Sequence, residues 1–295
     1  MSVAILHYKI YSILAIANEF IKMAENNPGY NQFRIPVPEA FEEVFSHFYF
    51  AENKSDTIIT KTLLPSYQTV LLFSFGAKPS FRSKQETYIE VDKYLMLGPI
   101  KQGFDYSLPP NAEVLSVNFK DDAFYRFFGD VCMADHVPMN PDELLHEDCF
   151  NILWHELNQM KDNLLRVNHI LKFCEPYLQH RNKIAGQLAN FKEETLNPIK
   201  SVASQNSQTE RSMQLNHKKH FGYSAKEVSR YERFLKTIDL IQKLASTKSK
   251  IDWLDIVTEC GYYDQSQLIH DFKHYINLTP TKYLKFQQDI CNPVT

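Results

Sequence analysis

The sequence repeats itself in its C-terminal third, where residues 55 positions apart have matching character. The clearest pairs are Met213 with Leu268 and Lys218 with Lys273. The other matched pairs are Ile199 with Leu254, Val202 with Val257, Thr209 with Asp264, Phe221 with Ile276, Gly222 with Asn277 and Ser224 with Thr279. Because a repeat places two copies of one structural unit in the chain, we expect both copies to have the same order of helices.

Helix-capping residues stand at equivalent places in the two copies. The residues of N-capping type are Thr209, Ser224, Asp264 and Thr279. Glu227 and Gln267 follow two of these caps by three residues, which is the spacing of a capping box. Pro280 stands at a first helical position, where its missing N–H does no harm. Each copy is therefore predicted to be a helix, a tight turn, a second helix and a further capped helix.

The second copy shows these pieces most clearly. A short helix is predicted over Trp253–Cys260, Gly261 supplies the turn, and a helix runs from Asp264 to about Tyr275. Its outward-facing residues are Gln265, Ser266, Gln267, His270 and Lys273. Amides, a hydroxyl and a lysine on one helix face suit the base edges and phosphates of nucleic acid. A connecting helix over about 225–245 would fix the separation of the two copies.

The first half of the chain consists of short aromatic and β-branched runs between glycine- and proline-rich turns. The predicted strands include Phe45–Phe50, Val70–Phe75, Tyr94–Leu97 and Val114–Phe119. Short strands with frequent turns indicate a compact β-sandwich or barrel. A long amphipathic helical stretch is predicted from about Asp148 to Tyr177, and another amphipathic helix from about Ile5 to Ala24.

Together these patterns predict an α+β protein with two domains. Residues 1–34 would hold the N-terminal helix and a linker, and residues 35–185 a β-rich, sandwich- or barrel-like domain with flanking helices. Residues 190–295 would form an all-α domain, in which a linker helix joins two helix-turn-helix units. A length of 295 residues fits two domains.

Charge is distributed unevenly between these parts. Residues 190–295 contain 15 Lys+Arg and 12 Asp+Glu, so they are slightly basic, whereas the whole chain has a net charge of −3. A basic C-terminal part behind an acidic front fits a nucleic-acid-binding half attached to a regulatory half.

Cysteine usage and hydropathy indicate a cytoplasmic protein. The five cysteines are widely spaced, with no CxxC pair: Cys132, Cys149, Cys174, Cys260 and Cys291. This pattern fits a reducing compartment and argues against both a disulfide framework and a zinc ribbon. No stretch reaches the roughly 18 apolar residues that a membrane-spanning helix needs, so no membrane partner is expected.

Motifs for metal, nucleotide or covalent chemistry are missing. His270 and His274 have HxxxH spacing, but no third ligand is evident, so no metal is expected. Neither GxGxxG nor GxxxxGK[ST] occurs, so no cofactor is expected. Cys132 and Cys174 are more simply explained as small buried residues than as reactive thiols. The chain is not expected to be an enzyme, because no matched acid, base and nucleophile appear.

The run Gly261–Tyr283 closely resembles the signature of the AraC/XylS regulators, and so do Thr209–Leu215, Phe221–Glu227 and Arg230–Phe234. The similarity covers about Pro198 to Phe286, roughly a third of the chain. The resemblance implies a bacterial transcription regulator that binds double-stranded promoter DNA through paired helix-turn-helix units.

The resemblance also assigns candidate DNA-binding residues. Those expected to face bases are Arg211, Gln214 and Leu215 in the first unit and Gln265, Ser266, Gln267 and His270 in the second. Lys218 and Lys273 would contact phosphates.

Four positions depart from the family pattern. Gln208 and His217 replace apolar residues, Ala225 replaces a proline, and Asn277 replaces a glycine. Asn tolerates a left-handed backbone, so Asn277 should do no harm. Polar residues at two core positions would leave the first unit less well packed.

The front half resembles, less sharply, an uncharacterised domain that often precedes this module in bacteria. The similar segments are Leu64-Pro65, Leu71–Gly76, Leu97-Gly98-Pro99, Val114–Lys120 and Tyr125–Gly129. This resemblance implies a half that senses a signal, dimerises, or both. A small-molecule effector, a second copy of the chain and RNA polymerase are further candidate partners.

Two alternatives remain open at this point. A degenerate first unit would give half-site DNA binding or a protein-interaction module. An enzyme acting on a small molecule in the β-rich half is the third reading.

Overall fold

The computed structural model describes residues 29–82, 88–129, 131, 137–191, 197–246, 251–286 and 290–291. The amphipathic helix predicted from Ile5 to Ala24 lies outside these residues. Within the described ranges, no helix is both long enough and apolar enough to cross a membrane.

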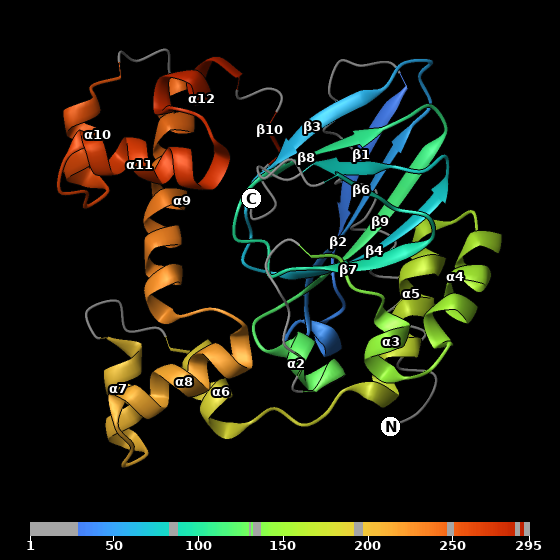
Figure 1. Cartoon of the computed structure of the whole chain (residues 1–295), viewed down its shortest axis with the longest axis horizontal. Helices are drawn as coiled ribbons and strands as arrows, with labels where there is room; N and C mark the ends of the chain where they lie inside the picture. The colour runs from blue at the N-terminus through green and yellow to red at the C-terminus, as the bar shows by residue number, and fades with distance from the viewer. Residues whose placement is uncertain are drawn as a thin grey trace.

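Two five-stranded sheets make up the β-rich half of the chain (Figure 1). The first sheet has the order β1-β2-β9-β4-β7 and consists of β1 (Tyr30–Ile35), β2 (Phe45–Asn53), β9 (Ala112–Phe119), β4 (Thr69–Gly76) and β7 (Tyr94–Leu97). The second has the order β10-β3-β8-β5-β6 and consists of β10 (Ile290–Cys291), β3 (Ile59–Leu63), β8 (Phe104–Leu108), β5 (Ser80–Arg82) and β6 (Tyr88–Glu90). The predicted β-sandwich is confirmed.

Strand β4 shows why the first sheet lies in the middle of this half. Leu71 and Phe73 pack in a core between the sheet and the helices, whereas Val70 and Leu72 pack in a second core between the two sheets. Because both faces of the strand are covered, its sequence is a continuous apolar run instead of an alternating one.

Helices cover the outer face of the first sheet. They are α2 (Ala123–Phe128), α3 (Pro141–Leu145), α4 (Cys149–Gln159) and α5 (Asn163–Cys174), with 3-10 turns η1 (Glu39–Phe41) and η2 (Glu175–Tyr177).

The long helical stretch predicted over Asp148–Tyr177 is interrupted between α4 and α5. Met160 has an extended backbone, and the Asp162 carboxylate accepts hydrogen bonds from the next helix's first N–H groups, so a new helix begins there.

The helical half of the chain follows. Its helices are α6 (Lys183–Ala189), α7 (Pro198–Gln205), α8 (Glu210–Phe221), α9 (Ala225–Ser246), α10 (Trp253–Glu259), α11 (Gln265–Ile276) and α12 (Pro280–Phe286). The 22-residue α9 is the predicted connecting helix and joins the two groups of shorter helices (Figure 1). One departure from an all-α half is β10, whose backbone pairs in parallel with the end of β3.

Candidate nucleic-acid interface

The repeat predicted from the sequence has a structural counterpart at the same offset. Helices α8 and α11 each have 12 residues and begin at Glu210 and Gln265, 55 positions apart. The same offset relates the first residues of α7 and α10, and those of α9 and α12. Helices α7 and α8, the first unit, and helices α10 and α11, the second unit, are therefore two copies of one helix pair.

Caps explain why α8 and α11 begin and end where they do. The side chains of Thr209 and Asp264 accept hydrogen bonds from the N–H three residues further on, at 3.1 and 2.7 Å. After the last residue of each helix, Gly222 and Asn277 have left-handed backbones with φ of 78° and 55°. The asparagine is accommodated as predicted.

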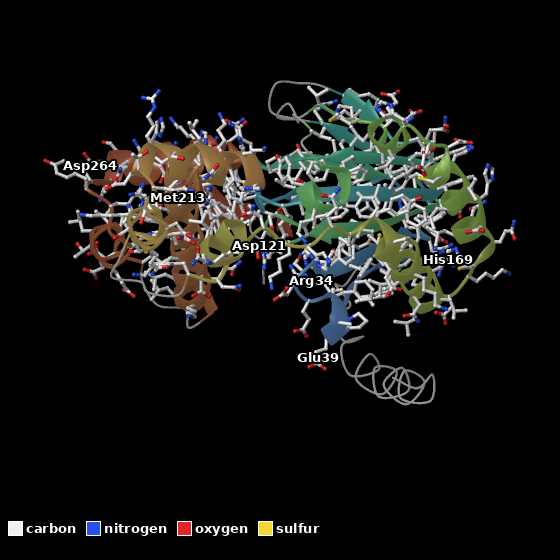
Figure 2. All side chains as sticks on the ribbon, turned by 90° about the horizontal axis from the view of Figure 1, so that it is seen from below. Arg34, Glu39, Asp121, His169, Met213 and Asp264 are labelled. Carbon is white, nitrogen blue, oxygen red and sulfur yellow. The ribbon has the colours of Figure 1, made fainter. Side chains whose placement is uncertain are left out.

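Each unit packs its own apolar residues. The first unit's core consists of Ala185, Leu188, Ile199, Val202, Ala203, Met213 and Phe221. Ala185 and Leu188 belong to α6, so α6 packs with the first unit. In the second unit, Leu268 and Phe272 pack with Phe234 of α9. Figure 2 shows Met213 among the helices and Asp264 at their outer edge.

The two polar residues expected to weaken the first unit have different surroundings. Gln208 is exposed and accepts a hydrogen bond from Asn216 Nδ2 at 3.3 Å, so its predicted core position is wrong. His217 is buried: its Nδ1 donates to the Tyr223 carbonyl at 2.8 Å, and its ring stacks on Phe221 with centroids 4.6 Å apart. Burial lowers the pKa of His217. The first unit is therefore packed around a neutral histidine.

We expect His217→Phe to make stability less sensitive to acid. Because the pKa of His217 is lowered in the folded protein, the unfolded chain takes up a proton first once the pH falls below about 6.5, and this favours unfolding. Urea unfolding at pH 7.5 and 5.5 measures the effect, with the exposed His180→Phe as the matched control. The same loss of stability on acidification in both variants would contradict the expectation.

Helices α8 and α11 expose the residues at their second, fifth, sixth and ninth positions. On an α-helix these positions lie within an arc of about 100°, so they form one face. We call these the outer faces: Arg211, Gln214, Leu215 and Lys218 on α8, and Ser266, Ile269, His270 and Lys273 on α11. Gln265, at the first position of α11, is exposed as well.

Two residues of α11 differ from the sequence-based expectation. Gln267 is half-buried, and its Oε1 accepts a hydrogen bond from the Tyr263 N–H at 2.9 Å, which ties this amide to the helix cap. Ile269 was not singled out, although it lies on the outer face. The repeat itself carried the missing signal, since Ile269 is the equivalent of Gln214 at the offset of 55.

A buried carboxylate holds α11 against α9. Asp271 is 1% exposed, and its two oxygens accept hydrogen bonds from Arg230 Nε at 2.7 Å and Arg233 Nη2 at 3.0 Å. Arg230 Nη2 also lies 3.0 Å from His270 Nδ1. A guanidinium can only donate, so Nδ1 accepts, and in the neutral ring Nε2 carries the hydrogen. Neither arginine is among the candidate residues predicted from the sequence.

Two loops of the β-rich half, the one between β3 and β4 and the one between β7 and β8, lie against the start of α9. The Tyr231 hydroxyl donates a hydrogen bond to the Pro65 carbonyl, and the Tyr231 and Tyr67 rings lie 4.7 Å apart. Lys101 Nζ forms an ion pair with Glu227 at 3.3 Å. Burial opposes ionisation of Glu227, but hydrogen bonds from Ser224 and the charge of Lys101 lower its pKa. Ser224 and Glu227 thus form the predicted capping box.

The β-rich half also contacts the ends of α8 and α11. The Gly103 N–H donates to the Tyr275 carbonyl of α11 at 2.6 Å. Gly222, at the end of α8, lies beside Tyr125 of α2 and Pro99. Both units are therefore held by the same half of the chain, and Asp121 lies at this junction in Figure 2.

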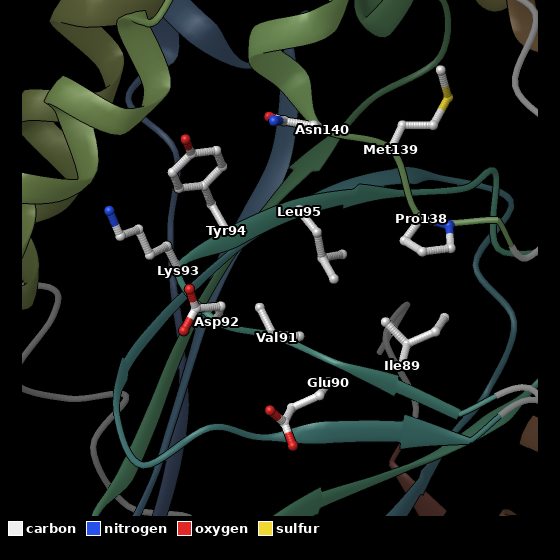
Figure 3. Close-up of a pocket in the computed structure, with 10 residues that line it drawn as sticks. All are labelled: Ile89, Glu90, Val91, Asp92, Lys93, Tyr94, Leu95, Pro138, Met139 and Asn140. Atoms are coloured by element: carbon white, nitrogen blue, oxygen red, sulfur yellow. The ribbon is translucent and has the colours of Figure 1, made fainter.

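A surface hollow of about 360 Å³ lies beside β6 and β7 in the β-rich half. It is lined by Ile89–Leu95 and Pro138–Asn140 (Figure 3). Of the lining residues, Lys93 already has a hydrogen-bond partner, because its Nζ donates to Asn151 Oδ1 at 2.9 Å. In the described part of the chain, no group of three His, Cys, Asp or Glu side chains could hold a metal ion.

The solved structures similar to this chain include the following three, each at 12% sequence identity. The structure of ToxT from Vibrio cholerae covers 81% of this chain and 98% of its own, with a TM-score of 0.39. ToxT from Vibrio cholerae O395, bound to (E)-4-(8-methylnaphthalen-1-yl)but-3-enoic acid, covers 87% and 98%, with a TM-score of 0.38. An RmlC-like cupin protein from Desulfovibrio desulfuricans covers 34% and 91%, with a TM-score of 0.25.

Residues 244–285 match the family described as bacterial regulatory helix-turn-helix proteins, AraC family. The matched residues contain α10, α11 and most of α12. No curated protein sequence matches the chain. The exposed polar face of α11 and this match define a DNA-binding transcription regulator. Its C-terminal helix-turn-helix, within residues 244–285, is of the AraC family type.

Proposed function

We propose that the chain reads promoter DNA with both units, placing α8 and α11 in successive major grooves. The observation that carries this proposal is the equivalent exposure of two outer faces joined by one helix. At about 1.5 Å per residue, the 22 residues of α9 span about 33 Å. One turn of DNA is roughly 34 Å, so one rigid connector matches the spacing of adjacent grooves.

The outer faces divide into two roles in this proposal. Lys218 and Lys273, at equivalent positions, contact phosphates and set the register on the duplex. The base-facing residues are Arg211, Gln214 and Leu215 on α8, and Gln265, Ser266 and His270 on α11. Gln267 contributes less, because its Oε1 already accepts the Tyr263 N–H.

The β-rich half takes the regulatory role. Because it contacts both units, a signal that moved the loops containing Pro65 and Lys101 would change the geometry presented to DNA. A small-molecule effector, a second copy of the chain and RNA polymerase are the partners proposed for this regulation. We place the start of the DNA-binding part at α6, since α6 packs with the first unit.

Salt dependence tests the proposal. Wild-type protein first selects a duplex from a random pool, and its affinity for that duplex is then measured over a range of salt concentrations. Each phosphate contact adds about −0.9 to the log–log slope, so Lys218→Ala with Lys273→Ala should reduce the slope by roughly two. Lys172→Ala, an exposed lysine of α5, is the control and should change nothing.

The single variants separate the two-unit proposal from its alternative. If Lys218→Ala leaves the slope unchanged while Lys273→Ala reduces it, the first unit makes no phosphate contact and the protein binds a half-site. If no duplex is selected, DNA reading by these helices is overturned.

A further inference from the structure

Each outer face carries one large aliphatic side chain among polar ones. On α8 it is Leu215, which is 63% exposed at the sixth position. On α11 it is Ile269, which is 37% exposed at the fifth position. A single exposed aliphatic residue is ordinary on a protein surface. An exposed aliphatic residue on the same face of both copies of a repeat is better explained by contact with an apolar group of a binding partner.

The major groove offers an aliphatic side chain one apolar partner. Base edges there present hydrogen-bond donors and acceptors, and the only apolar group is the 5-methyl of thymine. A Leu or Ile on a helix in that groove loses hydration when the complex forms. Contact with a methyl group makes this loss of hydration favourable, because both groups are apolar. Contact with a polar base edge costs free energy, because the edge is left without a hydrogen bond.

The polar neighbour stands on opposite sides of the aliphatic residue in the two copies. On α8 the order is Gln214 then Leu215, and on α11 it is Ile269 then His270. A glutamine amide pairs with the N6 and N7 of adenine. His270 Nδ1 is occupied by Arg230, which leaves Nε2–H to donate to an acceptor such as guanine N7 or O6. The two outer faces therefore favour different base sequences.

We propose that Leu215 and Ile269 are specificity residues, each contacting the methyl group of one thymine, in two half-sites that are unlike in sequence. This inference rests on the proposed DNA reading by both units. The thymine contacts lie about one helical turn of DNA apart, because α9 fixes the separation of the units.

Deoxyuridine provides the test, since it removes only the methyl group of thymine. In the duplex selected by wild-type protein, each thymine is replaced by deoxyuridine in turn. We expect affinity to fall about fourfold at two positions, as for the loss of one buried methyl group, about 0.8 kcal/mol. Ile269→Ala should abolish the sensitivity at one of these positions, and Leu215→Ala at the other.

Leu165→Ala, which removes a 59% exposed leucine from α5, is the matched control and should keep both sensitivities. The inference is overturned if no uracil weakens wild-type binding, or if both sensitivities persist in the two alanine variants. Selection of a duplex in that same experiment would leave the proposed DNA binding intact, so the two failures are distinguishable.

A swap of side chains tests the claim that the half-sites differ. Gln214→Ile with Leu215→His gives α8 the pair that α11 carries. A new selection with this variant should return two half-sites that are more alike than those of the wild type. An unchanged selected sequence would contradict the inference.

Discussion

Asp271→Asn should lower the free energy of unfolding by about 3 kcal/mol, because it leaves two guanidinium groups without their shared carboxylate. Asp271 is 1% exposed, whereas the side chains of Arg230 and Arg233 are 31% and 25% exposed. Water can reach the arginines in part, so we expect the lower end of the range for breaking a buried ion pair. Chemical denaturation with fluorescence detection measures the change.

Two further variants show whether the loss comes from the ion pair. Asp255→Asn neutralises an exposed carboxylate of α10 and should change stability by less than about 0.5 kcal/mol. Arg233→Met added to Asp271→Asn removes one of the uncompensated charges and should restore part of the stability. Equal effects of the two asparagine variants would contradict the assigned role of Asp271.

Local patterns in the sequence were sufficient to predict most of the helical half. The boundaries of α8, α9 and α11 follow from caps such as Thr209 and Asp264, which act on N–H groups within three residues. The same local chemistry explains why α4 and α5 are separate helices, because Asp162 is itself a capping residue. An interpretation based on apolar periodicity alone overlooks such a cap.

Contacts between distant parts of the chain were beyond prediction from local patterns. Tyr231 and Pro65 are separated by 166 positions, and no periodicity links a hydroxyl on a helix to a carbonyl in a loop between strands. The pairing of Asp271 with Arg230 and Arg233 has the same origin, because it depends on how α11 crosses α9. The family pattern predicts a core position for Gln208, whereas the loop between α7 and α8 exposes this side chain.

Gly222→Ala is expected to cost about 2–3 kcal/mol and to weaken the contact between the first unit and the β-rich half. The left-handed backbone, with φ of 78°, costs a residue with a Cβ about 1 kcal/mol or more. In addition, a Cβ at this position would lie 2.5 Å from Tyr125 Oη and 3.3 Å from Pro99 Cγ. One of these side chains, or the end of α8, has to move.

The repeat supplies a matched control for separating strain from collision. Asn277 has the equivalent left-handed backbone after α11 and is exposed, so Asn277→Ala should cost only the backbone term, about 1 kcal/mol. Tyr125→Phe removes the oxygen nearest to the new Cβ, and in the Gly222→Ala background it should recover part of the loss. Thermal unfolding of the wild type, Gly222→Ala, Asn277→Ala and the Gly222→Ala/Tyr125→Phe double variant measures both the backbone strain and the collision. A different result would be that Gly222→Ala and Asn277→Ala are equally costly and that Tyr125→Phe restores no stability. In that case the end of α8 is not packed tightly against α2, and the β-rich half does not restrain the first unit through this contact.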